Sequence, residues 1–128
     1  MEFITENPYK GKTGLTRLWN ALFYSFSGLC AAFRHEQAFR HEVVLALVLI
    51  PTALLLPVSL LGKALMIASV ILVLIAELLN SALETAVDRI SLEIHPLAKR
   101  AKDMASAAIL LSLVNWAAVW LLVLLHRD

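Results

Sequence analysis

Three long apolar stretches of this 128-residue chain limit the folds that it can adopt. Residues 43–62 form an uncharged run of 20, and residues 104–125 form another of 22. A third run begins at Ala64 and stays uncharged through Ala76. At a rise of about 1.5 Å per residue, roughly 20 helical residues span the hydrocarbon core of a bilayer. The chain is therefore predicted to cross a membrane three times.

The composition excludes an ordinary soluble domain. Apolar residues make up 60% of the chain and charged residues 16%, whereas soluble domains are about 45–50% apolar and roughly 25% charged. A chain this short cannot bury the excess in its own core, so that surface must face lipid or other subunits. The net charge of +1 gives no reason to expect nucleic acid, and the single Cys30 excludes an internal disulfide.

The chain is expected to form one all-α membrane domain over residues 1–128. Its expected segments are a flexible polar arm over 1–13, a surface helix over 14–34, and membrane helices over 43–62, 64–92 and 98–125. Pro51 and Pro57 are expected to kink the first membrane helix or end it early, because proline has no backbone N–H to donate. Lys63 is expected to cap the turn that follows.

The segment before the first span has the pattern of an amphipathic helix. Apolar side chains recur at a helical period from Leu15 to Phe33, and polar residues such as Arg17 and Tyr24 lie on the opposite face. Such a helix is typical of the membrane interface, and packing on a soluble core is the alternative. The three apolar runs favour the interface.

The distribution of positive charge predicts the orientation. Nine lysines and arginines lie before the first span or between the second and third, and only Lys63 and Arg127 lie on the other side. Positive charge favours the cytoplasmic side, so the N-terminus is expected inside and the C-terminus outside. Trp116 and Trp120, in the second half of the third span, are then expected near the far interface.

Four polar residues interrupt the second apolar run: Glu77, Asn80, Glu84 and Asp88. On a helix they share an arc of about 80° and rise about 16 Å along the axis. An acidic side chain at mid-membrane costs about 2.5–3.5 kcal/mol, so a cation, protonation or a wet cavity must compensate. For any one residue, a salt bridge to Arg89 or Lys102 is the simpler explanation. The four together favour a functional polar groove.

A second polar group begins the third membrane helix. Lys99, Lys102, Asp103 and Ser106 fall on one helical face. Charge flanking a span explains Lys99 but not Asp103. Glu36, nearer the N-terminus, is equally consistent with a solvated salt bridge. Carboxylates and cations at one membrane boundary suit Mg²⁺ and phosphate, and therefore phosphoryl transfer, although the chain has no soluble kinase motif.

These residues resemble the small bacterial integral-membrane diacylglycerol kinases. The segment ELLNSALETAVDR (77–89) is similar to the family pattern E-x-x-N-S-A-x-E-x-x-x-D-R. The blocks EQAFRHE (36–42) and RAKDM (100–104) are similar to two further family blocks in the same order, and the likeness covers about residues 14 to 125. Ile94 stands where family members carry tyrosine, with Pro96 close by, which leaves the nucleoside contacts there open.

The resemblance implies a homotrimeric lipid kinase of the bacterial inner membrane, which uses ATP with Mg²⁺ and has active sites shared between subunits. Glu77 corresponds to the general base, Glu36 and Glu84 to metal ligands, and Asn80 and Asp88 to supporting residues. Contacts to ATP are implied for Arg17, Tyr24, Glu36, Glu84, Glu93, His95, Lys102 and Asp103. Contacts to the lipid are implied for Arg17, Ala38, Phe39, Arg40, His41, Glu42, Glu77 and Ser106.

Two other functions remain open at this point. A polyprenol kinase would use a similar acidic helix, although the fit of residues 36–42 and the long surface helix favour diacylglycerol as the substrate. A non-enzymatic membrane scaffold could instead bind cations along the same acidic face.

Overall fold

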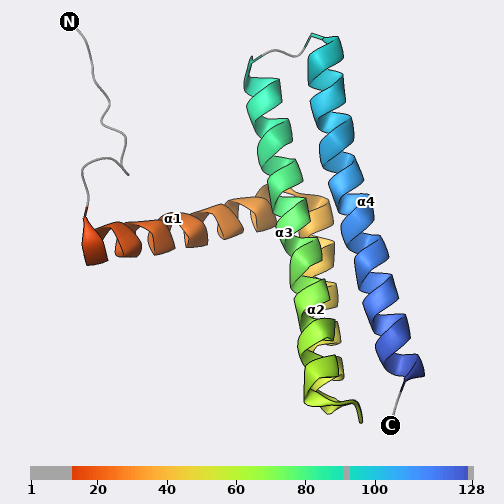
Figure 1. Cartoon of the computed structure of the whole chain (residues 1–128). Coiled ribbons are helices and arrows are strands. Elements are labelled where there is room, and N and C mark those ends of the chain that lie inside the picture. Colours follow the sequence, from red (N-terminus) through yellow and green to blue (C-terminus); the bar gives the residue numbers. More distant parts are fainter. Residues whose placement is uncertain (1–12, 91–92, 127–128) are drawn as a thin grey trace, which may run out of the picture.

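The computed structural model describes residues 13–90 and 93–126, so the expected arm over residues 1–13 lies almost entirely outside the described part. Every regular element in that part is an α-helix, as the composition led us to expect. The helices are α1 (Gly14–His35), α2 (Gln37–Leu55), α3 (Leu60–Ile90) and α4 (Pro96–Leu125) (Figure 1).

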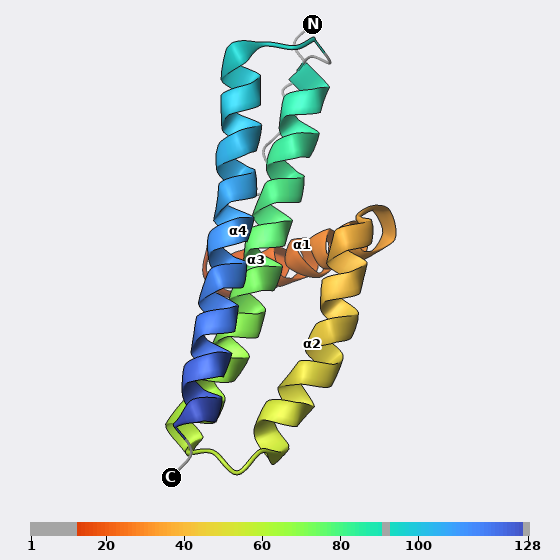
Figure 2. The same ribbon diagram turned by 90° about the vertical axis from the view of Figure 1, so that its right-hand side faces the viewer.

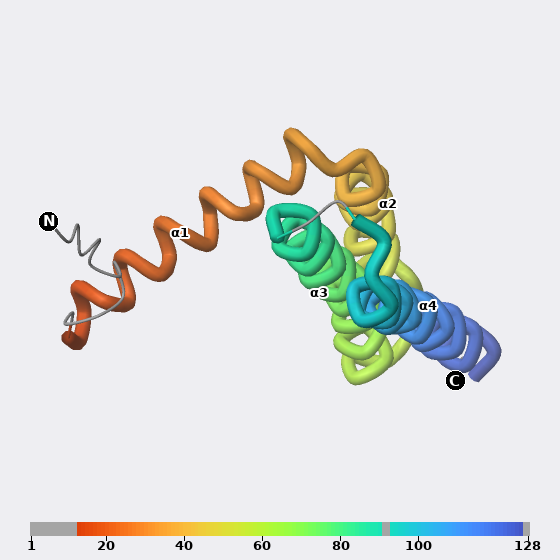
Figure 3. The backbone as a smooth tube through the Cα atoms, turned by 90° about the horizontal axis from the view of Figure 1, so that it is seen from above, coloured from red at the N-terminus to blue at the C-terminus, as the bar shows by residue number. Residues whose placement is uncertain are grey.

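Three of the helices run alongside one another, and α1 extends away from them to one side (Figure 1). The central helix, α3, packs against both α2 and α4, and Figure 2 shows the three extending in roughly the same direction. Figure 3 shows α1 projecting sideways from the end of α2. In the described residues α2, α3 and α4 are long and apolar enough to cross a membrane, which confirms the prediction of three spans.

The connection between α2 and α3 differs from the prediction. The first membrane helix was expected over residues 43–62, but α2 ends at Leu55 and α3 already begins at Leu60. Pro57 explains the earlier end, because a residue before proline is pushed away from the helical region, and Leu56 is extended, with φ −70° and ψ 147°. Pro51 is accommodated inside α2.

Lys63 therefore lies inside α3 rather than in the turn. Its Nζ nevertheless donates a hydrogen bond of 2.7 Å to the carbonyl oxygen of Leu54, in the last turn of α2. Because the last carbonyls of a helix have no partner within it, this bond satisfies one of them. Lys63 was expected to cap the turn, whereas it caps the last turn of α2 from within α3.

A sharp corner joins α1 to α2. Glu36, between the two helices, has extended backbone angles of φ −112° and ψ 109°. Arg40, one turn into α2, donates from Nη1 to the carbonyl oxygens of Phe33 (3.1 Å) and Arg34 (2.9 Å). The guanidinium therefore caps α1 and fixes the direction in which α1 leaves the bundle.

The core within one chain is small. Phe39 and Ala53 of α2 and Met66 and Val70 of α3 are buried, whereas many large apolar side chains are exposed; Leu55 is 86% exposed. Trp120 of α4 donates a 3.2 Å hydrogen bond from Nε1 to the carbonyl of Met66, which ties α4 to α3. The exposed apolar surface is far larger than soluble monomers show, so lipid or other subunits must cover it.

Gly62 marks a close approach between α3 and α4. A Cβ atom there would lie 3.0 Å from Cγ1 of Val123 and 3.2 Å from Oγ of Ser59. We expect Gly62→Val to lower the free energy of unfolding by about 1–3 kcal/mol, because overpacking forces neighbours from their rotamers. Thermal unfolding in detergent measures the change.

Gly28→Val is the matched control, since Gly28 is also helical and a Cβ there meets nothing within 4 Å. Its stability should stay close to that of the wild type. Equal stability of the two variants would contradict the close packing of Gly62.

Candidate functional site

The polar residues on one face of α3 become more exposed along the helix from its middle toward its C-terminal end. Glu77, at the inner end, is only 6% exposed. Asn80, one turn further, is half-buried, and Glu84 and Asp88 are exposed. The polar face that the spacing predicts therefore begins inside the helix bundle and ends at its surface. One helix face thus places Glu77 in a buried environment and Glu84 and Asp88 in an exposed one.

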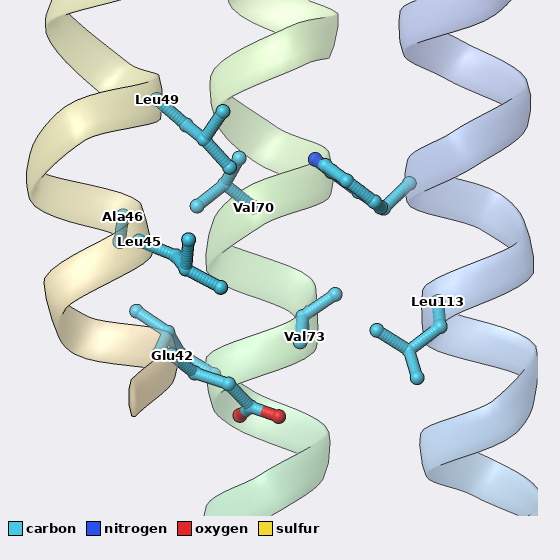
Figure 4. A pocket seen from close by; sticks show the side chains of 9 residues that line it. Glu42, Leu45, Ala46, Leu49, Val70, Val73 and Leu113 are labelled. Carbon is cyan, nitrogen blue, oxygen red and sulfur yellow. The ribbon is translucent and has the colours of Figure 1, made fainter. Parts of the chain in front are cut away.

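Glu42 of α2 faces Glu77 across the bundle. The two carboxyl groups are close enough to influence each other electrostatically, and Figure 4 shows the carboxyl of Glu42 directed from α2 toward α3. Oε2 of Glu42 is buried and receives no hydrogen bond from any described residue. Two ionised carboxylates repel each other, so a proton or a donor between them, such as a hydroxyl, would stabilise the contact.

Asn80 lies between the inner and outer acids. Its Nδ2 is 3.4 Å from Oε1 of Glu84, a long hydrogen bond that orients the amide. Its Oδ1 is buried with no hydrogen-bond partner in residues 13–90 and 93–126. An amide oxygen and a carboxylate oxygen therefore lie one turn apart on the same face. Both are hard oxygen ligands of the kind that Mg²⁺ prefers.

Two ion pairs lie at the outer end of the site. Nζ of Lys102 is 2.7 Å from Oδ1 of Asp88, which joins α4 to α3, and Nζ of Lys99 is 2.6 Å from Oδ2 of Asp103. For Asp88, the simpler explanation of an interhelical salt bridge with Lys102 is therefore confirmed. Lys102 and Asp103, adjacent in sequence, each face a different partner here.

The other predicted ATP residues are dispersed. Arg17 is exposed in the first turn of α1, at the end of that helix furthest from the bundle (Figure 1). Tyr24 is further along α1 and meets Phe23 edge-on, with ring centroids 5.9 Å apart. His95 is the N-cap of α4, where its Nδ1 accepts a 3.1 Å hydrogen bond from the N–H of Leu97. Glu93, two residues before His95, is exposed.

The predicted lipid residues of α2 are divided between core and surface. Phe39 is 3% exposed and belongs to the core, and Arg40 caps α1. Ala38 and His41, in the same part of α2, are exposed. Ser106, on α4, is also exposed. The structure therefore gives Phe39 and Arg40 structural contacts, and it leaves the other three accessible to lipid.

The acids do not form a preassembled metal cage. Across the described ranges, no group of three or more histidine, cysteine, aspartate or glutamate residues is placed to hold a metal ion. Glu36 and Glu84 are nevertheless both near enough to Glu77 for their charges to act on it. Mg²⁺ commonly binds through one or two carboxylates together with phosphate oxygens and water. The donor set thus fits a magnesium–nucleotide complex.

Trp116 is a polar group whose neighbours on other helices the sequence did not predict. It lines a cavity between α2, α3 and α4 together with Glu42, and its expected place near the far interface stays a prediction. Its Nε1 is buried and donates to nothing in the part of the chain that the structure describes. Trp120, four residues later, bonds to Met66. Spacing alone could not separate these two tryptophans, because both follow the same helical pattern.

The fold and the site together define a class: an all-helical, multi-pass membrane protein with an acidic site where the bundle meets its surface. The model of the prokaryotic diacylglycerol kinase family matches residues 23–124, and the chain belongs to that family.

Curated relatives agree over most of their length. The diacylglycerol kinase of Pseudomonas aeruginosa is 55% identical over 122 residues, which is 95% of this chain and 99% of the relative. That of Escherichia coli K12 is 46% identical over 112 residues (88% and 92%). That of Helicobacter pylori 26695 is 48% identical over 115 residues (90% and 89%).

The Asp88–Lys102 pair should contribute little to stability. Its side chains are 48% and 40% exposed, and exposed ion pairs are worth about 0–1 kcal/mol. We expect Asp88→Asn and Lys102→Gln each to change the free energy of unfolding by less than about 1 kcal/mol. A double-mutant cycle, followed by thermal unfolding in detergent at low and high salt, measures the coupling. A large coupling that persists at high salt would contradict this assignment.

Proposed function

We propose that this chain transfers the γ-phosphate of ATP to the free hydroxyl of sn-1,2-diacylglycerol and so forms phosphatidate. The observation that carries the proposal is the burial of Glu77 at the inner end of an acidic helix face, in a member of the diacylglycerol kinase family. A buried carboxylate facing apolar helices suits a lipid alcohol, and the exposed acids beyond it suit a hydrophilic nucleotide. The two ends of one helix face thus match two unlike substrates.

Glu77 would act as the general base. The lipid hydroxyl would donate a hydrogen bond to the Glu77 carboxylate, and its oxygen would attack the γ-phosphorus. As the new P–O bond forms, the bond to the ADP oxygen breaks and the hydroxyl proton passes to Glu77. Burial of Glu77 keeps water, the competing acceptor, away from the reacting phosphate. Glu42, beside it, is the second acid proposed to contact the lipid head.

Glu36 and Glu84 would hold Mg²⁺, with Asn80 orienting Glu84 through the hydrogen bond described above. When bound with ATP, the ion would offset negative charge on the β- and γ-phosphates. Lys102 would add a cation from α4, for which it must leave Asp88. Asp103, Arg17, Tyr24, Glu93 and His95 are the remaining residues proposed to contact the nucleotide.

A homotrimer with sites shared between subunits would bring these parts together. Arg17 and Tyr24 lie on α1, which projects from the bundle, whereas Lys102 and the acidic face lie on α3 and α4 (Figure 1). The small core and the exposed apolar surface of a single chain also support assembly. In the trimer, α1 would lie in the membrane interface, with residues such as Phe23, 68% exposed here, against lipid.

The proposed location is the bacterial inner membrane. The excess of lysine and arginine in the N-terminal region and between α3 and α4 supports a cytoplasmic N-terminus and an external C-terminus. The acidic face of α3 would then open toward cytoplasmic ATP.

The lipid substrate is the sharpest test. Purified protein in mixed micelles should transfer labelled phosphate from Mg·ATP to dioleoylglycerol, and should transfer much less to undecaprenol. Preference for undecaprenol would support the polyprenol kinase instead. Incorporation of phosphate into neither lipid would contradict both kinases and favour the cation-binding scaffold.

Two substitutions separate the proposed base from the proposed metal ligand. Glu77→Gln should abolish turnover, by at least about 100-fold, and leave binding of Mg·ATP largely intact, because a glutamine cannot take the proton. Glu84→Gln should weaken binding of Mg·ATP itself. Turnover and equilibrium nucleotide binding measure the two effects, and near-normal turnover of Glu77→Gln would disprove the base assignment.

A further inference from the structure

A small cavity lies between α2, α3 and α4, next to the inner end of the acidic face. Its volume is about 70 Å³, and its wall is almost entirely apolar, formed by residues such as Leu45, Val73 and Leu113. Figure 4 shows these side chains converging from the three helices. Two polar side chains also line it, Glu42 from α2 and Trp116 from α4. The cavity is therefore apolar with a polar group from each of two outer helices.

Both polar groups have unmet hydrogen-bonding needs. Nε1 of Trp116 and Oε2 of Glu42 are buried, and neither has a hydrogen-bond partner within residues 13–90 and 93–126. An indole N–H can only donate, and a carboxylate oxygen can only accept. Buried groups of this kind are nearly always paired in folded proteins. An occupant that supplies an acceptor would satisfy the indole N–H of Trp116.

Trp120 shows that an indole on this helix can find a partner within the protein. Its Nε1 donates to the carbonyl oxygen of Met66 at 3.2 Å. Trp116 lies 6.2 Å from it, centroid to centroid, on the same helix. Nε1 of Trp116 therefore lacks an acceptor among the described residues because of where Trp116 lies, beside the cavity, and not because indoles on α4 lack acceptors in general.

The position of the cavity favours a hydroxy ester as the occupant. Val73, in the cavity wall, precedes Glu77 by four residues on α3, which is about 6 Å along the helix axis. In diacylglycerol the ester groups follow the free hydroxyl by a few atoms, toward the acyl chains. A lipid with its hydroxyl at Glu77 would thus carry an ester carbonyl to the level of Trp116.

We propose that this cavity is a subsite for the ester group of diacylglycerol, in which Nε1 of Trp116 donates a hydrogen bond to an ester carbonyl oxygen. The inference rests on the proposed function and adds a determinant of specificity. A polyprenol carries a hydroxyl but no ester, so it would leave the indole N–H unpaired, and an unpaired buried donor penalises the wrong substrate.

A comparison of an ester lipid with its ether analogue tests the subsite. The wild type should phosphorylate dioleoylglycerol with a kcat/KM roughly tenfold above that of 1,2-di-O-oleylglycerol, which has no carbonyl. Trp116→Phe, which keeps an aromatic ring but removes the N–H, should lower kcat/KM for the diester roughly fivefold to tenfold and leave the diether nearly unchanged. The preference for the ester would then be largely lost.

Trp120→Phe is the matched control, because it removes an indole N–H that bonds to the protein instead. It should retain the preference for the ester even if it lowers stability. If Trp116→Phe does not fold, the wild-type comparison still decides, since equal kcat/KM for the diester and the diether would overturn the subsite.

Two further outcomes also count against the proposal. Equal losses on both lipids in Trp116→Phe would assign Trp116 to packing or to a bound water, and no loss on either would show that its N–H is not used. In both cases wild-type activity on dioleoylglycerol would leave the proposed kinase function standing. Failure of the wild type to phosphorylate dioleoylglycerol would instead remove the function and the subsite together.

Discussion

The burial of a carboxyl group in an apolar helix bundle is the constraint on which the rest of this structure depends. An acid at membrane depth is unfavourable by about 2.5–3.5 kcal/mol, and it is retained only where a partner or a function compensates. Here Glu77 meets Glu42, another acid, so the contact is incomplete without a proton or a donor. Oε2 of Glu42 thus lies buried beside this contact with no hydrogen-bond donor among the described residues.

The length of α3 connects this buried acid to water. At 31 residues the helix is longer than the roughly 20 residues needed to span the hydrocarbon core. The extra turns carry Glu84 and Asp88 to the exposed end, next to Lys102 of α4. A single helix therefore fixes the spacing between a buried acid and exposed ones, without any loop in between.

The local sequence pattern predicted the helices and the polar face of α3. The contacts between helices depend on long-range packing, which the pattern does not specify. Helical periodicity was enough to place Glu77, Asn80 and Glu84 on one face, because those positions depend on one helix only. The expected range of the first membrane helix ran to Gly62, but α2 ends at Leu55, which agrees with the expectation that a proline could end this helix early. The contacts of Glu42 with Glu77 and of Trp116 with the cavity depend on how neighbouring helices slide and rotate against each other, which spacing within one helix cannot specify.

The two ends of the acidic face differ in how easily their contacts can change. The Asp88–Lys102 pair is exposed, so water can replace either partner and opening the pair costs little. Lys102 could therefore exchange a carboxylate for a phosphate without disturbing the helices. Glu42 and Glu77 lie among apolar side chains, where lost partners are not replaced by water. Groups proposed to meet a mobile nucleotide thus lie at the adaptable end, and groups proposed to align the lipid lie at the fixed end.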